Sequence, residues 1–163
     1  MPKQLIPVSQ ALDLLREQPG QIAAMTAGLS EHQLHMPPEH NEWSCVEMLG
    51  HLRTCSDMWG QAIEKILAEE QPTFKAVNPR TWAEQVDYNE LDFVPSFKSY
   101  KRQRTKLLKL LEGLQPKDWQ RYAIVLVAGK PNKRSVHFYA DWLAVHERTH
   151  MRQFKKTVEA VQS

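Results

Sequence analysis

The apolar positions of the chain recur at helical spacing in four long segments. Apolar residues three and four positions apart are typical of the buried face of an amphipathic helix. Such stripes predict four helices, from about Ser9 to Leu29, from Ser44 to about Glu70, from about Val94 to Leu114 and from Ser135 to about Val161. Helices of this length bury their stripes most simply against one another, so we expect an all-α fold, a four-helix bundle.

Turn and capping residues set the limits of these helices. Pro19 and Gly20 are expected to interrupt the first segment, because proline cannot donate the backbone hydrogen bond that continues a helix. Ser44, followed three residues later by Glu47, has the pattern of a capping box, and Ser135 is the expected cap of the last helix.

Two stretches lack a helical stripe. Residues 71–91 contain two prolines and read as a loop with a single helical turn. Residues 122–128 form a short apolar run, which fits either a strand or a buried loop. No repeat or change of composition divides the chain, so residues 1–163 are expected to form one domain.

Composition limits the classes of partner. The 21 basic and 19 acidic residues are interleaved and leave a formal charge of +2. Nucleic-acid binding needs basic residues gathered on one face, and a membrane span needs an apolar run of about 18 residues; neither pattern is present. We therefore expect a cytoplasmic protein that acts on a small molecule. The sequence is compatible with a homodimer. Cys45 and Cys55 read as buried thiols in a reducing compartment.

His146 and His150 are spaced for metal binding. Side chains four residues apart on a helix have Cβ atoms about 5–6 Å apart, so both imidazoles can reach one ion. Counting about 100° per residue places both on the inward face of the last helix. Buried imidazoles need polar partners, and a shared cation would supply one, as would hydrogen bonds in the core. His51, on the flank of the second helix, is the best third ligand.

The run from His146 to His150 also matches the His-Glu-x-x-His pattern of zinc proteases. Those enzymes need a further ligand, commonly well downstream. Only residues 151–163 follow the motif, and Glu159 is their sole acidic residue. A protease is therefore disfavoured.

Together these residues resemble the DinB/YfiT-like superfamily, whose members are regarded as metalloenzymes. The matching positions are Trp43, Ser44, Glu47, His51, Leu52, His146, His150 and Gln153. The resemblance implies an up-down-down-up four-helix bundle and a divalent ion, often nickel or zinc, held by His51, His146 and His150. Family members include isomerases and S-transferases that use bacillithiol, mycothiol or glutathione, so a low-molecular-weight thiol is a candidate cofactor.

A three-histidine site suits catalysis. Neutral imidazoles leave the ion its double charge and an open position. Water bound there can reach a pKa of about 7, and a bound thiol is deprotonated, so hydrolysis and thiol transfer are both expected uses. The alternative is a non-catalytic metal-binding or interaction module, in which a fourth protein ligand such as Cys55 closes the site and the ion ties helices together.

Three further residues are candidates for catalysis. Glu147 is expected to point inward, and Arg104 interrupts the apolar line of the third helix. They could form a structural ion pair, for which Asp57 is another partner, or Arg104 could anchor an acidic substrate or a thiol's carboxylate. Tyr139 could hydrogen-bond a bound ligand or simply pack in the core.

Overall fold

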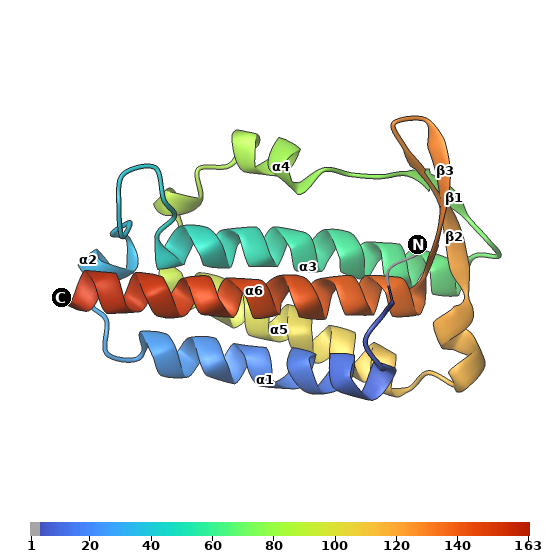
Figure 1. Ribbon diagram of the computed structural model, residues 1–163, viewed down its shortest axis with the longest axis horizontal. Helices are drawn as coiled ribbons and strands as arrows, with labels where there is room; N and C mark the ends of the chain where they lie inside the picture. Colours follow the sequence, from blue (N-terminus) through green and yellow to red (C-terminus); the bar gives the residue numbers. More distant parts are fainter. Residues whose placement is uncertain (1–3) are drawn as a thin grey trace.

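The computed structural model describes residues 4–163, apart from the side chains of residues 82–84, and consists mainly of long helices packed side by side (Figure 1). The long helices are α1 (Val8–Thr26), α3 (Cys45–Ala68), α5 (Phe93–Glu112) and α6 (Val136–Gln162). Helix α6 packs against α1 and α3, and α5 packs against the same two helices. The predicted four-helix bundle is therefore confirmed.

A small sheet lies at one end of the bundle, so the all-α prediction is incomplete (Figure 1). Strand β2 (Tyr122–Val127) pairs in parallel with β1 (Thr73–Lys75) and antiparallel with β3 (Lys130–Ser135). Ala128 and Gly129 connect β2 to β3 with φ values of 51° and 79°, the conformation that two-residue hairpin turns require. The apolar run after Arg121 is thus a strand.

The segment predicted as a loop holds more structure than expected. Besides β1, it contains α4 (Pro79–Gln85) and a short 3-10 helix, η1 (Tyr88–Glu90). Two other short elements complete the chain, α2 (Glu31–Leu34) and the 3-10 helix η2 (Pro116–Gln120).

Helix α1 is continuous through Pro19, contrary to the predicted break, and it begins at Val8 rather than at Ser9. Because proline has no N–H, the carbonyl of Leu15, four residues earlier, loses its helical partner. The Nη1 of Arg104 on α5 donates a hydrogen bond to that carbonyl at 3.0 Å. A side chain from a neighbouring helix thus replaces the missing backbone bond.

The caps of α3 and α6 follow the sequence pattern. Ser44 accepts a hydrogen bond from the backbone N–H of Glu47, whose side chain accepts one in return from the N–H of Ser44. Ser135 caps α6 through the N–H of Phe138. These caps fix where α3 and α6 begin, and both helices carry the predicted metal ligands.

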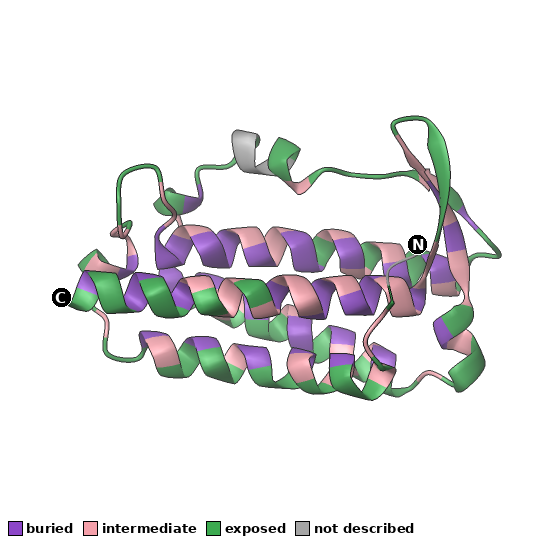
Figure 2. Ribbon diagram, viewed as in Figure 1, coloured by how far each residue is buried: buried purple, intermediate pink, exposed green. Residues whose placement is uncertain are grey.

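Buried side chains line the inner faces of the helices (Figure 2). One group surrounds Ile63 and Leu143 near the sheet, and another surrounds Leu49 and Phe154 toward the opposite end. Cys45 and Cys55 are buried and free, as expected. None of the helices in the described part of the chain is long and apolar enough to cross a membrane.

Candidate metal centre

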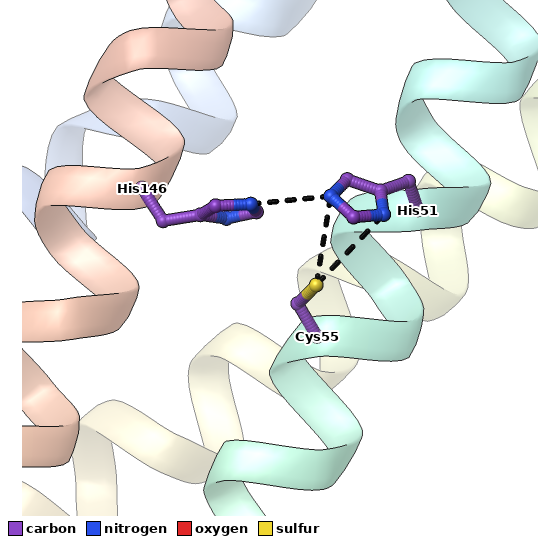
Figure 3. Close-up of side chains that lie close together, drawn as sticks. All are labelled: His51, Cys55 and His146. Atoms are coloured by element: carbon purple, nitrogen blue, oxygen red, sulfur yellow. Dashed lines mark hydrogen bonds between the residues drawn. The ribbon is translucent and has the colours of Figure 1, made fainter. Parts of the chain in front are cut away.

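The three predicted ligands meet between α3 and α6. The Nε2 atom of His146 lies 3.1 Å from Nε2 of His51 and 3.2 Å from Nε2 of His150. The ring centroids are 4.5–5.0 Å apart in all three pairs. Figure 3 shows His51 and His146 pointing at each other from facing helices. The structure therefore brings together the residues that the sequence selected, whereas metal binding by them stays a prediction.

Residues around the cluster orient the rings. The Nδ1 atom of His150 lies 2.8 Å from Oε1 of Gln153, one turn later on α6. When Nδ1 donates its hydrogen to that oxygen, Nε2 of His150 keeps a lone pair that faces His146. The indole of Trp43 packs on the His51 ring at a centroid distance of 4.9 Å.

The three imidazoles are neutral at pH 7. Burial, followed by the neighbouring His150, lowers the pKa of His51 to about 4. Burial, followed by the charges of the other two rings, lowers the pKa of His146 to about 3. Burial also lowers the pKa of His150. Each ring therefore carries one N–H and one lone pair.

Hydrogen bonds alone cannot satisfy this arrangement. Nε2 of His146 has two nitrogen neighbours but only one hydrogen or lone pair to offer them. Its Nδ1 is buried and has no hydrogen-bond partner among the described residues. A cation held by the three Nε2 atoms would not pair this Nδ1 atom, so only the close approach of the Nε2 atoms points to an ion.

A divalent cation fits the point where the nitrogens converge. It would accept a lone pair from the Nε2 atom of each ring, so the three nitrogens would no longer need to hydrogen-bond to one another. With zinc–nitrogen bonds of about 2.0–2.1 Å and tetrahedral angles, neighbouring ligand nitrogens are about 3.3–3.4 Å apart. The observed separations of 3.1 and 3.2 Å are slightly shorter than this and close to it.

Cys55 lies beside the histidines. Its Sγ is 3.7 Å from Nε2 of His51, and ligand atoms of His51, Cys55 and His146 all lie within 4.8 Å of one another (Figure 3). Burial, and then the negative charge of Glu147, raise the pKa of the Cys55 thiol to about 12, so it is protonated in the metal-free protein. Cys55 thus remains a candidate fourth ligand.

Glu147 and Arg104 form a buried ion pair beneath the cluster. Their side chains are 0% and 2% exposed, and the second carboxylate oxygen of Glu147 accepts a hydrogen bond from Tyr100. The other predicted partner of Arg104, Asp57, accepts a hydrogen bond from Gln103 instead. This geometry supports the structural reading of the pair, and a catalytic role for either residue stays a prediction.

Tyr139 lies on the wall of a cavity next to the cluster. The cavity has a volume of about 660 Å³, and its wall includes Trp59, Phe74, Arg134 and Trp142. The Trp59 ring also meets the His146 ring edge-on at 5.0 Å. Sequence reasoning selected Tyr139 but missed the other wall residues; the available signal was Trp142, which lies one helical turn before His146.

The sequence model of the DinB superfamily matches residues 14–154. A Geobacillus thermodenitrificans (strain NG80-2) protein named "Putative metal-dependent hydrolase" is 24% identical over 160 residues, which cover 91% of this chain and 84% of that protein. The Bacillus subtilis (strain 168) protein YuaE is 26% identical over 149 residues, covering 83% of this chain and 89% of YuaE.

Among solved structures, YfiT from Bacillus subtilis has a TM-score of 0.81 and 16% sequence identity, covering 98% of this chain and 91% of YfiT. It is described as a "probable metal-dependent hydrolase with an unusual four-helix bundle topology". The family match extends over parts of all four long helices and includes the three clustered histidines. The chain therefore belongs to the DinB superfamily.

Proposed function

We propose that the chain is a metal-dependent enzyme that hydrolyses a small molecule, with a divalent ion held by His51, His146 and His150. The observation that carries the proposal is the convergence of three neutral imidazole nitrogens that hydrogen bonds alone cannot satisfy. The names of the Geobacillus protein and of YfiT as metal-dependent hydrolases support the reaction class. Nickel and zinc are the proposed ions, since both suit imidazole ligands.

The ion, when bound, would supply Lewis acidity for the reaction. The chain's own residues prepare the site for it. The low pKa values of His51 and His146 keep both rings uncharged at neutral pH, so each ring has a lone pair to offer an ion. Gln153 fixes the ring of His150, and the indoles of Trp43 and Trp59 cover the flanks of the cluster.

We further infer the up-down-down-up order of the four helices. His51 lies beside His146, whereas Trp59, two turns further along α3, stacks on Trp142, one turn earlier in α6. This pairing supports antiparallel packing of α3 and α6. The trace in Figure 1 agrees, since α3 and α5 run one way and α1 and α6 the other.

Metal analysis tests the ligand assignment. After loading with Zn²⁺ or Ni²⁺ and exhaustive dialysis, we expect about one ion per chain in the wild type and almost none in His146→Ala, which removes the central ligand. His32→Ala is the matched control, because His32 is an exposed histidine away from the cluster. Equal metal content in the wild type and His146→Ala would overturn the proposal.

Activity assays test the reaction class. The metal-loaded protein is incubated with a panel of activated esters and amides, and separately with glutathione and an aromatic electrophile. Hydrolysis that EDTA abolishes is the expected result. Conjugation of the thiol without hydrolysis would favour S-transfer, the second candidate, and a low-molecular-weight thiol cofactor.

The non-catalytic alternative has its own test, because Cys55 lies close enough to close the site. If the ion mainly holds α3 and α6 together, Cys55→Ser should lose both the bound metal and thermal stability. Neither the hydrolysis assay nor the thiol-conjugation assay should then detect activity. The proposed enzyme instead predicts that Cys55→Ser retains the ion.

A further inference from the structure

We propose that the cavity beside the histidine cluster binds the substrate as a planar apolar molecule with one carboxylate, which Arg134 holds. The cavity is formed by α3, α6, the sheet and the segment that follows β1. The proposal rests on the proposed function only in identifying the bound molecule as the substrate.

The walls of the cavity suit a flat apolar body. Trp59 and Trp142 stack on each other with centroids 4.5 Å apart and an interplanar angle of 27°, and Phe74 of β1 and Val127 of β2 add apolar surface. The volume of about 660 Å³ lies within the range of about 300–1,000 Å³ that is usual for small-molecule sites. Val77 also lies at the wall and adds apolar surface.

The charges around the cavity have one sign. Lys65, Lys75 and Arg134 line it, and none of the described lining residues is acidic. Lys65 has a partner in Glu69, at 3.9 Å. Within the described part of the chain, no salt bridge neutralises Lys75 or Arg134. Among the described side chains, a carboxylate would therefore find two cations that have no ion-pair partner.

Arg134 is arranged to recognise a carboxylate. Its guanidinium lies over the ring of Phe138 at 5.2 Å and over the ring of Trp142 at 5.1 Å. Stacking on ring faces restricts the guanidinium plane. Tyr139, another wall residue, accepts a hydrogen bond from Arg134, and the remaining N–H groups along the edges of the guanidinium can serve a carboxylate. A planar guanidinium binds a carboxylate with two parallel hydrogen bonds, an arrangement that a lysine cannot reproduce.

The position of Trp59 joins this cavity to the proposed metal site. Its indole forms part of the cavity wall and meets the His146 ring edge-on at 5.0 Å. None of the three histidines lines the cavity, so a molecule that packs on Trp59 and Trp142 would be separated from His146 by the Trp59 ring. Arg134, on the strand that leads into α6, would hold the carboxylate at the sheet end of the cavity.

Calorimetric titration of the metal-free protein with 2-naphthoate tests the proposal. We expect 2-naphthoate to bind and the neutral 2-naphthamide to bind at least about tenfold more weakly, since a charge-assisted hydrogen bond is worth that factor or more. Arg134→Gln should weaken 2-naphthoate binding by a similar factor and leave 2-naphthamide binding unchanged. Lys75→Gln should produce a smaller loss, because Lys75 is more exposed than Arg134.

Lys133→Gln is the matched control. Lys133 precedes Arg134 on β3 but lies over the Tyr122 ring at 4.1 Å and does not line the cavity. Its substitution removes one nearby positive charge without changing the site. Equal binding of 2-naphthoate and 2-naphthamide, equal losses in Arg134→Gln and Lys133→Gln, or no binding of 2-naphthoate would each overturn the proposal.

The metal-free protein separates this inference from the proposed function. Loss of 2-naphthoate binding with normal metal uptake would remove only the substrate class. Normal 2-naphthoate binding in a protein that takes up no metal would remove only the proposed metalloenzyme.

Discussion

Single side chains around the histidine cluster set how well it can hold an ion. Gln153 is not a proposed metal ligand. Its Oε1 lies 2.8 Å from Nδ1 of His150 and fixes the direction of that ring. Residues that orient a metal-binding histidine in this way commonly contribute 10–100-fold to affinity. Gln153 is therefore part of the site although it lies outside the ligand set.

We predict that Gln153→Ala lowers the affinity for Zn²⁺ by about 10–100-fold while the protein stays folded. Competition with a chromophoric chelator measures this affinity. Gln162→Ala, an exposed glutamine in the last turn of the same helix, is the control and should bind as the wild type does. Unchanged affinity in Gln153→Ala would mean that Gln153 does not orient His150 for metal binding.

Two glycines of α3 make a matched pair. A Cβ atom at Gly50 would lie 2.6 Å from Cδ1 of Tyr88, whereas one at Gly60 would meet nothing within 4 Å. Tyr88 is buried, and its hydroxyl lies 2.7 Å from Oγ1 of Thr54. Gly50 therefore lets η1 pack closely on α3.

We predict that Gly50→Ala lowers the free energy of unfolding by about 1–3 kcal/mol, the usual cost of overpacking. Gly60→Ala should instead raise it by about 0.5–1 kcal/mol, because alanine favours a helix over glycine. Urea denaturation of both variants measures the difference. Equal effects would show that the contact between Gly50 and Tyr88 does not matter for stability.

At the scale of helices, one buried network joins α5, α6 and α1. Arg104 pairs with Glu147 and also donates to the Leu15 carbonyl, which Pro19 leaves without a backbone partner. Both charged side chains are almost fully buried. The pair therefore fixes the part of α6 that carries His146 and His150.

Removing one member of the pair should be costly, and removing both much less so. We predict that Glu147→Leu lowers the free energy of unfolding by about 3–5 kcal/mol, because it leaves the Arg104 charge buried without a counter-ion. The double variant Glu147→Leu with Arg104→Met should recover much of that loss. Denaturation curves of Glu147→Leu, Arg104→Met and the double variant measure these losses. A loss in the double variant equal to the sum of the two single losses would contradict this explanation.

The helices and their caps could be predicted because the signals are local. Ser44 with Glu47, and Ser135, mark helix starts through neighbours in sequence. The continuous α1 could not be predicted, since the partner of the Leu15 carbonyl comes from α5. Strand β3 has the sequence Lys-Pro-Asn-Lys-Arg-Ser, with no apolar alternation, and only its pairing with β2 defines it.

The candidate site, too, could be predicted only in part from the sequence. His146 and His150 share a helix face, so their spacing was visible in the sequence. His51 was selected from its place on the flank of the second helix, and the family resemblance implied the same three ligands. The cavity was not predicted, because Trp59 fits the apolar stripe of its helix and reads as an ordinary core residue. Arg134 reaches the cavity only through the hairpin that β2 and β3 form.

The molecule as a whole should lose stability in mild acid when it is free of metal. The pKa values of His51, His146 and His150 lie below about 6.5, the value expected in the unfolded chain. As the pH falls below that value, the histidines are protonated in the unfolded chain but not in the folded protein. The free energy of unfolding therefore decreases progressively toward about pH 4.

We predict that urea midpoints of the metal-free protein fall between pH 7 and pH 5. The fall should be smaller in His146→Leu, which removes one of the three rings. Identical pH dependence in the wild type and in His146→Leu would contradict the assignment of this loss to the cluster.

The most direct test of the three-histidine centre is a crystal structure of the zinc-loaded protein with anomalous diffraction data at the zinc absorption edge. We predict one strong anomalous peak between α3 and α6, within bonding distance of the Nε2 atoms of His51, His146 and His150. A map without a peak there, or with zinc bound elsewhere while these imidazoles remain in contact with one another, would contradict the proposed metal centre.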